Sequence, residues 1–257
     1  MPWNVLLISD SRGGGLSKLI RQSISKDLNI KLEDRIHKGA TLDDILKILE
    51  RAGRRQHTST WDTVIIAAGI CNFTKRVIVT KNQFYIEYKD RKVEETRHLI
   101  DHILELFGNK AHICTIPPAD IKKYSTHERH DQDIQAEQQH LIEDVEEINR
   151  HIIGRNINRD FATIDLAKQT YQSSLKTQGE RKKRIVKFSA KGLRDGLHPT
   201  SEARTAWAKY MAKAIPQIIA KQQEKSTEDE DENSGTEDER ESWDHKRSKK
   251  PKRSLDM

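Results

Sequence analysis

Three residues in two distant segments of this sequence could together activate a nucleophile. Ser11 follows the apolar run at residues 5–8, and residues 195–199 read Asp-Gly-Leu-His-Pro, so that Asp195 stands three residues before His198. A serine hydroxyl attacks a carbonyl carbon efficiently only when an imidazole accepts its proton, and the imidazole needs a carboxylate that fixes its tautomer and stabilises its charged form. Ser11, His198 and Asp195 are therefore candidate catalytic residues. Taken singly, each is better explained as a turn or surface residue, but the ordered set favours a site.

The elements around these residues are those of a parallel α/β sheet. Because three glycines at residues 13–15 lead from an apolar strand into a helical pattern, Ser11 is expected at the carboxyl end of a strand, where open α/β sheets bind ligands. Residues 199–202, Pro-Thr-Ser-Glu, are typical of a helix start, which leaves Asp195 and His198 in the loop before it. Alternating apolar patterns predict a three-layer αβα sandwich with five parallel strands. The expected strands are 4–8, 30–36, 62–68, 111–116 and 161–166, and the expected helices are 15–26, 42–53, 92–107, 132–153 and 201–223.

These segments resemble the SGNH, or GDSL-like, hydrolase family over residues 3–220. In that family a serine after the first strand is the nucleophile, and an Asp-x-x-His-Pro segment before the last helix supplies the other two triad members; Ser11, Asp195 and His198 match these positions. The resemblance implies a flavodoxin-like sheet with strand order 2-1-3-4-5. It also implies that the backbone N–H of Gly39 helps to bind the oxyanion, and that no cofactor or metal is needed.

One block departs from the family pattern. The family usually has glycine, any residue and asparagine after the third strand, and the asparagine amide is an oxyanion donor. Here the sequence reads Gly69-Ile-Cys-Asn, so Cys71 occupies the family position and Asn72 comes one residue late. A thiol is a weak donor, and loss of one oxyanion donor costs about a hundred- to a thousand-fold in rate. The expected donors are therefore Gly39 and Asn72, or Cys71 at the family position.

Two functional hypotheses follow from the sequence. The first is an SGNH-type serine esterase that hydrolyses a small carboxylic ester; Arg12 and Lys38, each beside a proposed site residue, either favour an anionic substrate or face solvent. The second is a catalytically impaired SGNH-fold binding module in a nuclear or mobile-element protein that associates with nucleic acid, because SGNH-like domains also occur in proteins encoded by some non-LTR retrotransposons. The departure at Cys71 and the basic charge of the chain motivate this alternative.

Two insertions and a charged tail surround the predicted core. Residues 77–80 and 84–88 are expected to pair as a hairpin that forms a wall of the cleft, and the polar insertion 168–191 is expected to be either a flap over the site or a solvated loop. From residue 224 onward apolar residues almost vanish, which predicts a disordered tail. The predicted organisation is thus an SGNH hydrolase-like domain at 1–223 and an acidic, then basic, tail at 224–257.

Charge and composition limit the partners and the compartment. The 257 residues carry a net charge of +6; the tail at 224–257 has 8 Lys and Arg against 12 Asp and Glu, so the remainder carries +10. The basic run at 246–253 resembles a nuclear localisation signal or a nucleic-acid contact, with a nuclear import factor or nucleic acid as partner, or it only solubilises the chain end. No apolar run approaches the length of a membrane span, and the two cysteines lie apart. We therefore expect an intracellular protein without a membrane partner, and the basic run makes the nucleus one candidate compartment.

Overall fold

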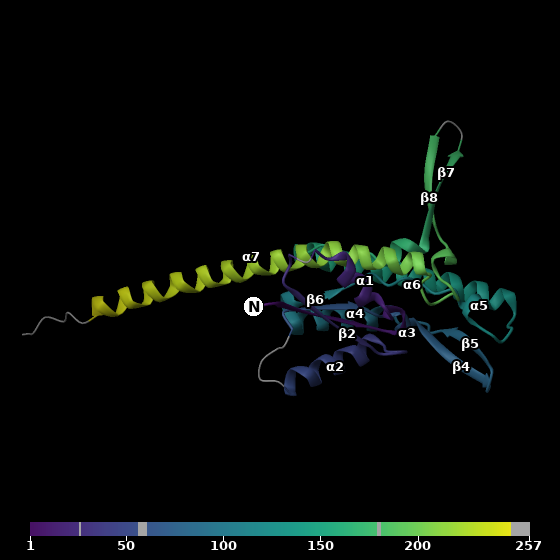
Figure 1. Cartoon of the computed structure of the whole chain (residues 1–257), viewed down its shortest axis with the longest axis horizontal. Helices are drawn as coiled ribbons and strands as arrows, with labels where there is room; N and C mark the ends of the chain where they lie inside the picture. Colours follow the sequence, from purple (N-terminus) through teal and green to yellow (C-terminus); the bar gives the residue numbers. More distant parts are fainter. Residues whose placement is uncertain (26, 56–60, 179–180, 248–257) are drawn as a thin grey trace, which may run out of the picture. The chain divides into compact units, whose positions relative to one another are not determined.

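A parallel four-stranded sheet forms the centre of the computed structural model, which describes residues 1–25, 27–55, 61–178 and 181–247, with side chains for 1–25, 27–52, 61–174 and 186–227. The strand order is β2-β1-β3-β6 (Figure 1). The first two strands pair in register over their whole length, Trp3 with Ile30 and Ser9 with Ile36. The strands span β1 Trp3–Ser9, β2 Ile30–Ile36, β3 Thr63–Ala67 and β6 Ala111–Ile113.

The two central strands are apolar on both faces, because helices cover both sides of the sheet. Every residue of β3 is buried, as are the last five of β1. This is the composition that a parallel sheet between two helical layers requires. The expectation of an αβα sandwich is thereby confirmed. The main helices are α1 Leu16–Ser23, α2 Leu42–Arg55, α4 Val93–Phe107, α6 Asp131–Asn158 and α7 Ser201–Arg247.

The two faces of the sheet pack against different helices. Leu6, Ile8, Val64 and Ile66 belong to one buried cluster with apolar residues of α2, α4 and α6. Side chains alternate along a strand, so the intervening residues point to the opposite face. There, Leu16 of α1 and Trp207 of α7 line one small internal space with Ala67. Burial of these side chains supplies the main stabilisation of the domain.

The expected fifth strand is absent from the described residues. Residues 161–166 run beside the chain that follows β6, but only one backbone hydrogen bond links them, from the Thr115 N–H to the Ile164 carbonyl at 3.1 Å. A ladder requires a repeated series of such bonds. β6 is itself only three residues long, so the sheet narrows to four strands at this edge. The prediction of five strands in the order 2-1-3-4-5 is therefore wrong in its last member and correct for the first four.

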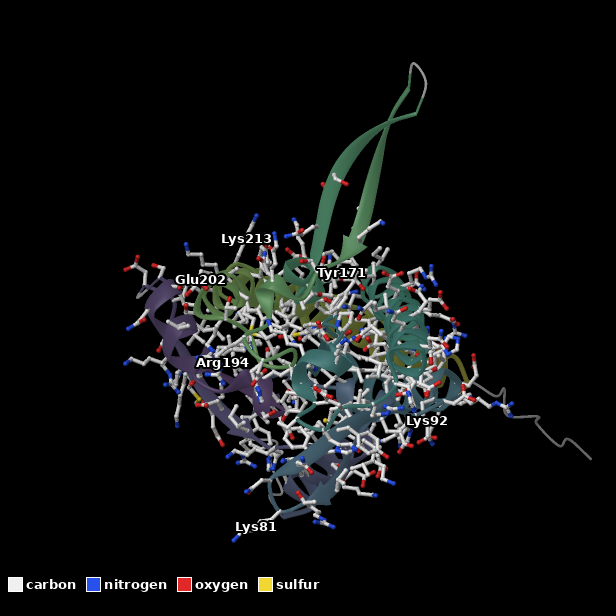
Figure 2. The ribbon with its side chains drawn as sticks, turned by 90° about the vertical axis from the view of Figure 1, so that its right-hand side faces the viewer. Lys81, Lys92, Tyr171, Arg194, Glu202 and Lys213 are labelled. Atoms are coloured by element: carbon white, nitrogen blue, oxygen red, sulfur yellow. The ribbon has the colours of Figure 1, made fainter. Side chains whose placement is uncertain are left out.

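Both insertions form antiparallel pairs. The first, β4 Thr74–Thr80 with β5 Gln83–Tyr88, follows the short helix α3 Ile70–Phe73 and confirms the predicted hairpin, with β4 starting three residues earlier than expected. The second is β7 Tyr171–Gln178 with β8 Arg181–Phe188, which projects from the helical layers (Figures 1 and 2). The prediction of a flap over the site or a solvated loop at 168–191 is thus wrong for most of the segment, since β-branched and aromatic residues such as Val186 and Phe188 suit a strand.

Short helical turns complete the fold, and the first of them along the chain carries the predicted site residues Ser11 and Arg12. They are α5 Ile121–Tyr124 and the 3-10 turns η1 Ser11–Gly13, η2 Gly108–Lys110, η3 Ala167–Thr170 and η4 Ala190–Gly192.

The last segment of the described chain continues as the helix α7, and the predicted tail at 224–257 stays a prediction. The chain divides into two compact units, Met1–Gln217 and Ile218–Met257, and α7 is helical to Arg247. Glu, Lys and Gln are good helix formers, and pairs one turn apart such as Lys221 with Glu224, at 3.2 Å, support a helix without a core. Residues 248–257, which hold most of the basic segment 246–253, lie outside the described residues. Within the described part of the chain, none of the helices has both the length and the apolar character needed to cross a bilayer.

Candidate active site

The fold brings Ser11, His198 and Asp195 into one hydrogen-bonded chain. The Nε2 atom of His198 lies 3.1 Å from the Ser11 hydroxyl oxygen, and its Nδ1 lies 2.8 Å from Oδ2 of Asp195. β1 ends at Ser9, and the Asp10 carboxylate caps the turn η1 by accepting from the Arg12 N–H, so Ser11 stands at the carboxyl end of the central strand. With Nδ1–H donating to Asp195, Nε2 of His198 is the atom that can accept the serine proton.

The Asp195 carboxylate is held by its own loop. Its Oδ1 accepts from the backbone N–H of Leu197, at 3.0 Å, and of His198, at 2.8 Å. Burial raises the pKa of Asp195, but these bonds together with the imidazole outweigh burial and lower the pKa to about 2. The carboxylate is therefore ionised throughout the neutral range and can stabilise a charged imidazole.

Gly196 allows this loop to close. Its φ of +91° is in the region that favours glycine, and a Cβ atom there would lie 2.7 Å from the Asp120 carbonyl oxygen and 2.9 Å from the Tyr124 nitrogen. The Asp120 N–H also donates to the Gly196 carbonyl at 2.7 Å. The loop with Asp195 and His198 is thus fastened directly to α5.

A cleft of about 680 Å³ opens at the Ser11 hydroxyl. The predicted residues Lys38 and Gly39 line it from the turn after β2, where Gly39 has a φ of +74°. The β4–β5 hairpin lines it through Thr74, Lys75, Arg76 and Ile86, which confirms that this hairpin forms a wall of the cleft. None of the described residues of the insertion 168–191 lines it. The remaining lining residues are Ser11, Thr41, Cys71, Lys89, Tyr124, Leu197 and His198.

Cys71 and Asn72 face different surroundings. Cys71 lines the cleft, whereas the buried Asn72 does not, and its Oδ1 accepts from the Leu42 N–H at the start of α2, at 2.9 Å. Both residues belong to the single turn α3, and successive residues of a helix point about 100° apart. The side chain of Asn72, which lies one residue after the family position, therefore points away from the cleft. Burial, and to a smaller extent Asp10, raises the pKa of the Cys71 thiol to about 11, so it remains protonated at neutral pH.

Arg12 does not take the role that the sequence suggested for it. Its side chain is 4% exposed, it forms an ion pair with Asp10 at 2.9 Å, and its Nη1 donates to the Pro117 carbonyl at 2.7 Å. A guanidinium committed to these partners is unable to reach a substrate in the cleft. Arg12 instead ties the serine turn to the chain after β6. The expectation that Arg12 binds substrate is wrong, because a residue beside the nucleophile was taken to share its exposure.

The cleft residues that the sequence did not mark as site residues include three cations and a tyrosine. Lys75, Arg76 and Lys89 belong to the hairpin and its exit, and the charge of the hairpin could have signalled them. Tyr124 packs edge-on against the His198 ring, with centroids 5.9 Å apart. Nothing in the local sequence of α5 marks Tyr124, because its proximity to His198 arises only from the tertiary fold.

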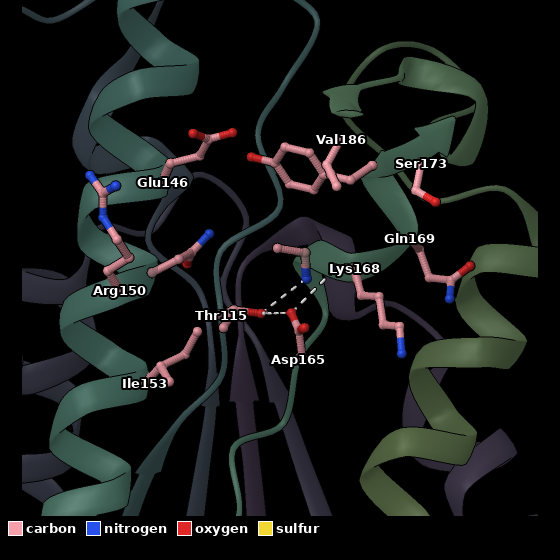
Figure 3. A pocket seen from close by; sticks show the side chains of 12 residues that line it. Thr115, Glu146, Arg150, Ile153, Asp165, Lys168, Gln169, Ser173 and Val186 are labelled. Atoms are coloured by element: carbon pink, nitrogen blue, oxygen red, sulfur yellow. Dashed lines mark hydrogen bonds between the residues drawn. The ribbon is translucent and has the colours of Figure 1, made fainter. Parts of the chain in front are cut away.

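A second cavity, of about 620 Å³, lies away from these residues between α6 and the base of the β7–β8 hairpin (Figure 3). The Thr115 hydroxyl donates to Asp165 at 2.8 Å and accepts from the Ala167 N–H at 3.0 Å, so the polar groups at its floor satisfy one another. It contains none of the predicted site residues. Among the residues whose side chains are described, no group of three or more His, Cys, Asp or Glu is arranged to hold a metal ion.

Comparison with known proteins identifies the fold. No protein-family model matches the sequence, and no curated protein matches it. Among solved structures, a lipolytic protein of the G-D-S-L family from Veillonella parvula is similar with a TM-score of 0.52 at 12% identity, covering 83% of this chain and 98% of that one. An acetyl xylan esterase variant from Geobacillus stearothermophilus is similar with a TM-score of 0.52 at 14% identity, covering 84% and 94%. The order of the sheet, the position of the site at the end of β1 and these neighbours together show that the chain has the α/β fold of the SGNH hydrolases.

Proposed function

We propose that the protein is a serine esterase that hydrolyses a carboxylic ester with Ser11 as nucleophile. The observation that carries the proposal is the hydrogen-bonded chain from Ser11 through His198 to Asp195, with both distances in the range that proton transfer requires. The similar solved structures include esterases, which supports hydrolase chemistry on this fold. At the identities found, the likeness alone supports the fold and leaves the substrate to be measured.

The proposed reaction has two steps. In the first, a bond forms between Ser11 Oγ and the ester carbonyl carbon, the serine proton passes to His198 Nε2, and the imidazolium returns it to the departing alcohol as the C–O bond breaks. In the second, His198 takes a proton from water, the resulting hydroxide attacks the acyl-enzyme, and the carboxylic acid leaves as Ser11 recovers its proton. Asp195, ionised because of its low pKa, stabilises the imidazolium in both steps.

The oxyanion of each tetrahedral intermediate needs hydrogen-bond donors. We assign this role to the backbone N–H groups of Ser11 and Gly39, which come from two loops that line the same cleft. Cys71 adds only a thiol, a weak donor. Asn72 is assigned a supporting role, because its carbonyl oxygen is already bonded to Leu42 and its side chain lies outside the cleft lining.

The test compares hydrolysis of a short-chain nitrophenyl ester, and labelling by a serine-directed fluorophosphonate, in the wild type and in Ser11→Ala. We expect Ser11→Ala to lose both. Ser23→Ala is the matched control, because Ser23 is an exposed serine whose hydroxyl only donates to the Leu19 carbonyl; it should behave as wild type. If hydrolysis and labelling persist in Ser11→Ala, or are absent from the wild type, the esterase proposal fails and a non-catalytic binding role becomes the better explanation.

A further inference from the structure

The cleft at Ser11 is strongly basic. Four of the residues that line it carry cationic side chains: Lys38, Lys75, Arg76 and Lys89. Arg76 follows Lys75 directly in β4, so their side chains point to opposite faces of the hairpin, and Arg76 is the one on the side of Phe84 and Tyr124. Among the described residues that line it there is no Asp or Glu. The nearby carboxylate of Asp195 is not part of the cleft lining and is hydrogen-bonded to Nδ1 of His198. Charges of one sign that face a common hollow create a field that attracts the opposite charge.

The protein neutralises these cations only in part: Lys75 lies opposite Glu87 in the hairpin, and the charges of Asp44 and Glu95 act on Lys89. Within the described part of the chain, no carboxylate lies within ion-pair distance of any of the four, whereas Arg129 and Arg97, outside the cleft, each pair with a glutamate. Lys89 is partly buried, and its Nζ donates to the Cys71 carbonyl oxygen at 2.6 Å. Burial of a lysine without a carboxylate partner is unfavourable unless an anion joins it, and burial lowers the pKa of Lys89.

One of the cations is held in position by aromatic rings that lead to the proposed triad. The Arg76 guanidinium lies 3.9 Å from the centre of the Phe84 ring, Phe84 meets Tyr124 edge-on at 5.5 Å, and Tyr124 meets His198. A guanidinium stacked in this way keeps its N–H groups free for an anion, and its planar fork matches the oxygens of a phosphate. Arg76 is therefore oriented before any ligand binds.

We propose that the substrate of this site is an ester that also carries a phosphate group, which Lys38, Arg76 and Lys89 bind while the ester carbonyl carbon lies at Ser11. The inference rests on the proposed esterase function and adds the substrate class to it. Phosphate fits the cluster better than a singly charged group, because three cations from separate segments, the turn after β2, strand β4 and the exit of β5, can share its oxygens and its charge. The scissile bond remains the carboxylic ester, and the phosphate leaves unchanged on one of the two products.

The experiment measures acetate release from three esters: 4-acetoxyphenyl phosphate, 4-acetoxybenzoate and the neutral phenyl acetate. We expect kcat/KM to be at least tenfold higher for the phosphate ester than for phenyl acetate at low ionic strength, mainly through a lower KM, with the carboxylate ester between them. The preference should shrink as salt is raised, because the cations are partly exposed. Equal values for the charged and neutral esters would overturn the proposal.

Charge removal gives the second arm. Lys38→Met and Arg76→Met should each lower the preference for the phosphate ester by about fivefold, the factor expected for a unit charge pair about 4 Å apart in water. Lys81→Met is the matched control, because Lys81 is an exposed lysine in the turn of the same hairpin and outside the cleft lining (Figure 2). It should keep the wild-type preference. An equal loss of the phosphate-ester preference in Lys81→Met and Arg76→Met would mean that the overall positive charge of the protein, and not this cleft, attracts the substrate.

The failure of this inference is distinguishable from failure of the esterase proposal. Binding of 4-acetoxyphenyl phosphate to Ser11→Ala can be followed by calorimetry without any turnover, and we expect saturable one-to-one binding that Arg76→Met weakens. Hydrolysis of phenyl acetate that depends on Ser11, without phosphate preference or binding, would sustain the esterase and refute the substrate class. A short RNA or DNA oligonucleotide that occupies the cleft while the phosphate ester does not bind would also refute it, in favour of a polyanion.

Discussion

Replacing Cys71 with asparagine should increase the esterase rate of this protein. Cys71 lines the cleft at the position where the resembled family has an amide donor, and the thiol there is a weak one. Burial keeps that thiol protonated, so it contributes neither a negative charge nor a nucleophile. An asparagine on the same turn of α3 would direct its NH₂ group into the cleft, which has room for the longer side chain.

The size of the gain follows from the value of one donor. Removing an oxyanion-hole donor costs about 10²–10³ in kcat, or about 2.7–4 kcal/mol. An introduced donor does not have optimised geometry, so we expect Cys71→Asn to raise kcat by about tenfold to a hundredfold with a smaller change in KM. In the free protein the added amide is partly buried, and a buried donor without a partner costs about 1–3 kcal/mol. The melting temperature should therefore fall by a few degrees.

The assay is steady-state hydrolysis of a nitrophenyl ester by Cys71→Asn, Cys71→Ala and the wild type, each also in the Ser11→Ala background. Cys71→Ala should change kcat by less than about threefold, because it removes only a weak donor. The gain in Cys71→Asn should vanish without Ser11. A folded Cys71→Asn that hydrolyses the ester no faster than Cys71→Ala would refute the assignment of Cys71 to the oxyanion side of the cleft.

Three further outcomes test the supporting structure. Asn72→Ala should lower the free energy of unfolding by about 1–3 kcal/mol, because the buried Leu42 N–H loses its acceptor, whereas Asn72→Asp keeps an acceptor and should lose less in chemical denaturation. Gly196→Ala should destabilise the domain by about 1–2 kcal/mol because of the positive φ alone, and by more because the new Cβ would clash with backbone atoms at the start and end of α5. Since the same loop carries Asp195 and His198, the esterase rate should fall about a hundredfold. An unchanged rate would show that the position of this loop does not depend on its close packing against α5. Burial, aided by Arg159, lowers the pKa of His112 to about 3, below its value near 6.5 in the unfolded chain, so the neutral imidazole contributes its full stability above pH 6.5 and loses it as the pH falls toward 3. In a folded His112→Gln variant the free energy of unfolding should therefore decline less steeply over that pH range, by up to about 1.4 kcal/mol per pH unit. An unchanged slope would refute His112 as the origin of the decline.

Much of the fold and the proposed triad could be predicted because the relevant signals are local. The apolar run before Ser11 and the glycines after it specify a strand and a turn, and the Asp-x-x-His spacing lets one carboxylate bond both a backbone N–H and the imidazole of His198. The first four sheet strands were predictable for the same reason. The prediction of a strand at 161–166 was wrong because that strand would have to pair with β6, which ends at Ile113. The local sequence of a segment does not show how long a neighbouring strand is.

The remaining errors concern the direction in which side chains point, not which segments form the site. Arg12 is adjacent to Ser11 in sequence, yet it points into the interior because Asp10 and the Pro117 carbonyl provide partners there. Lys75 and Arg76 are remote from Ser11 in sequence, yet their hairpin brings them to its cleft. Side-chain direction is decided by tertiary partners, which a sequence pattern does not contain.

The conformation of Gly69 determines which way the side chains of Cys71 and Asn72 point. Its φ of +129°, and the approach of Ile116 to within 2.5 Å of where a Cβ would lie, fix the start of α3 immediately after β3. Because α3 is a helical turn, the extra residue before Asn72 changes the direction of the side chains that follow it. The amide of Asn72 points toward α2, and Cys71 faces the cleft. If the protein is the esterase proposed above, a site with one fewer strong donor would have to stabilise the reacting ester in another way. Binding energy from a remote anionic group can position the ester carbonyl at Ser11, and the cations of the cleft are the groups that would provide it.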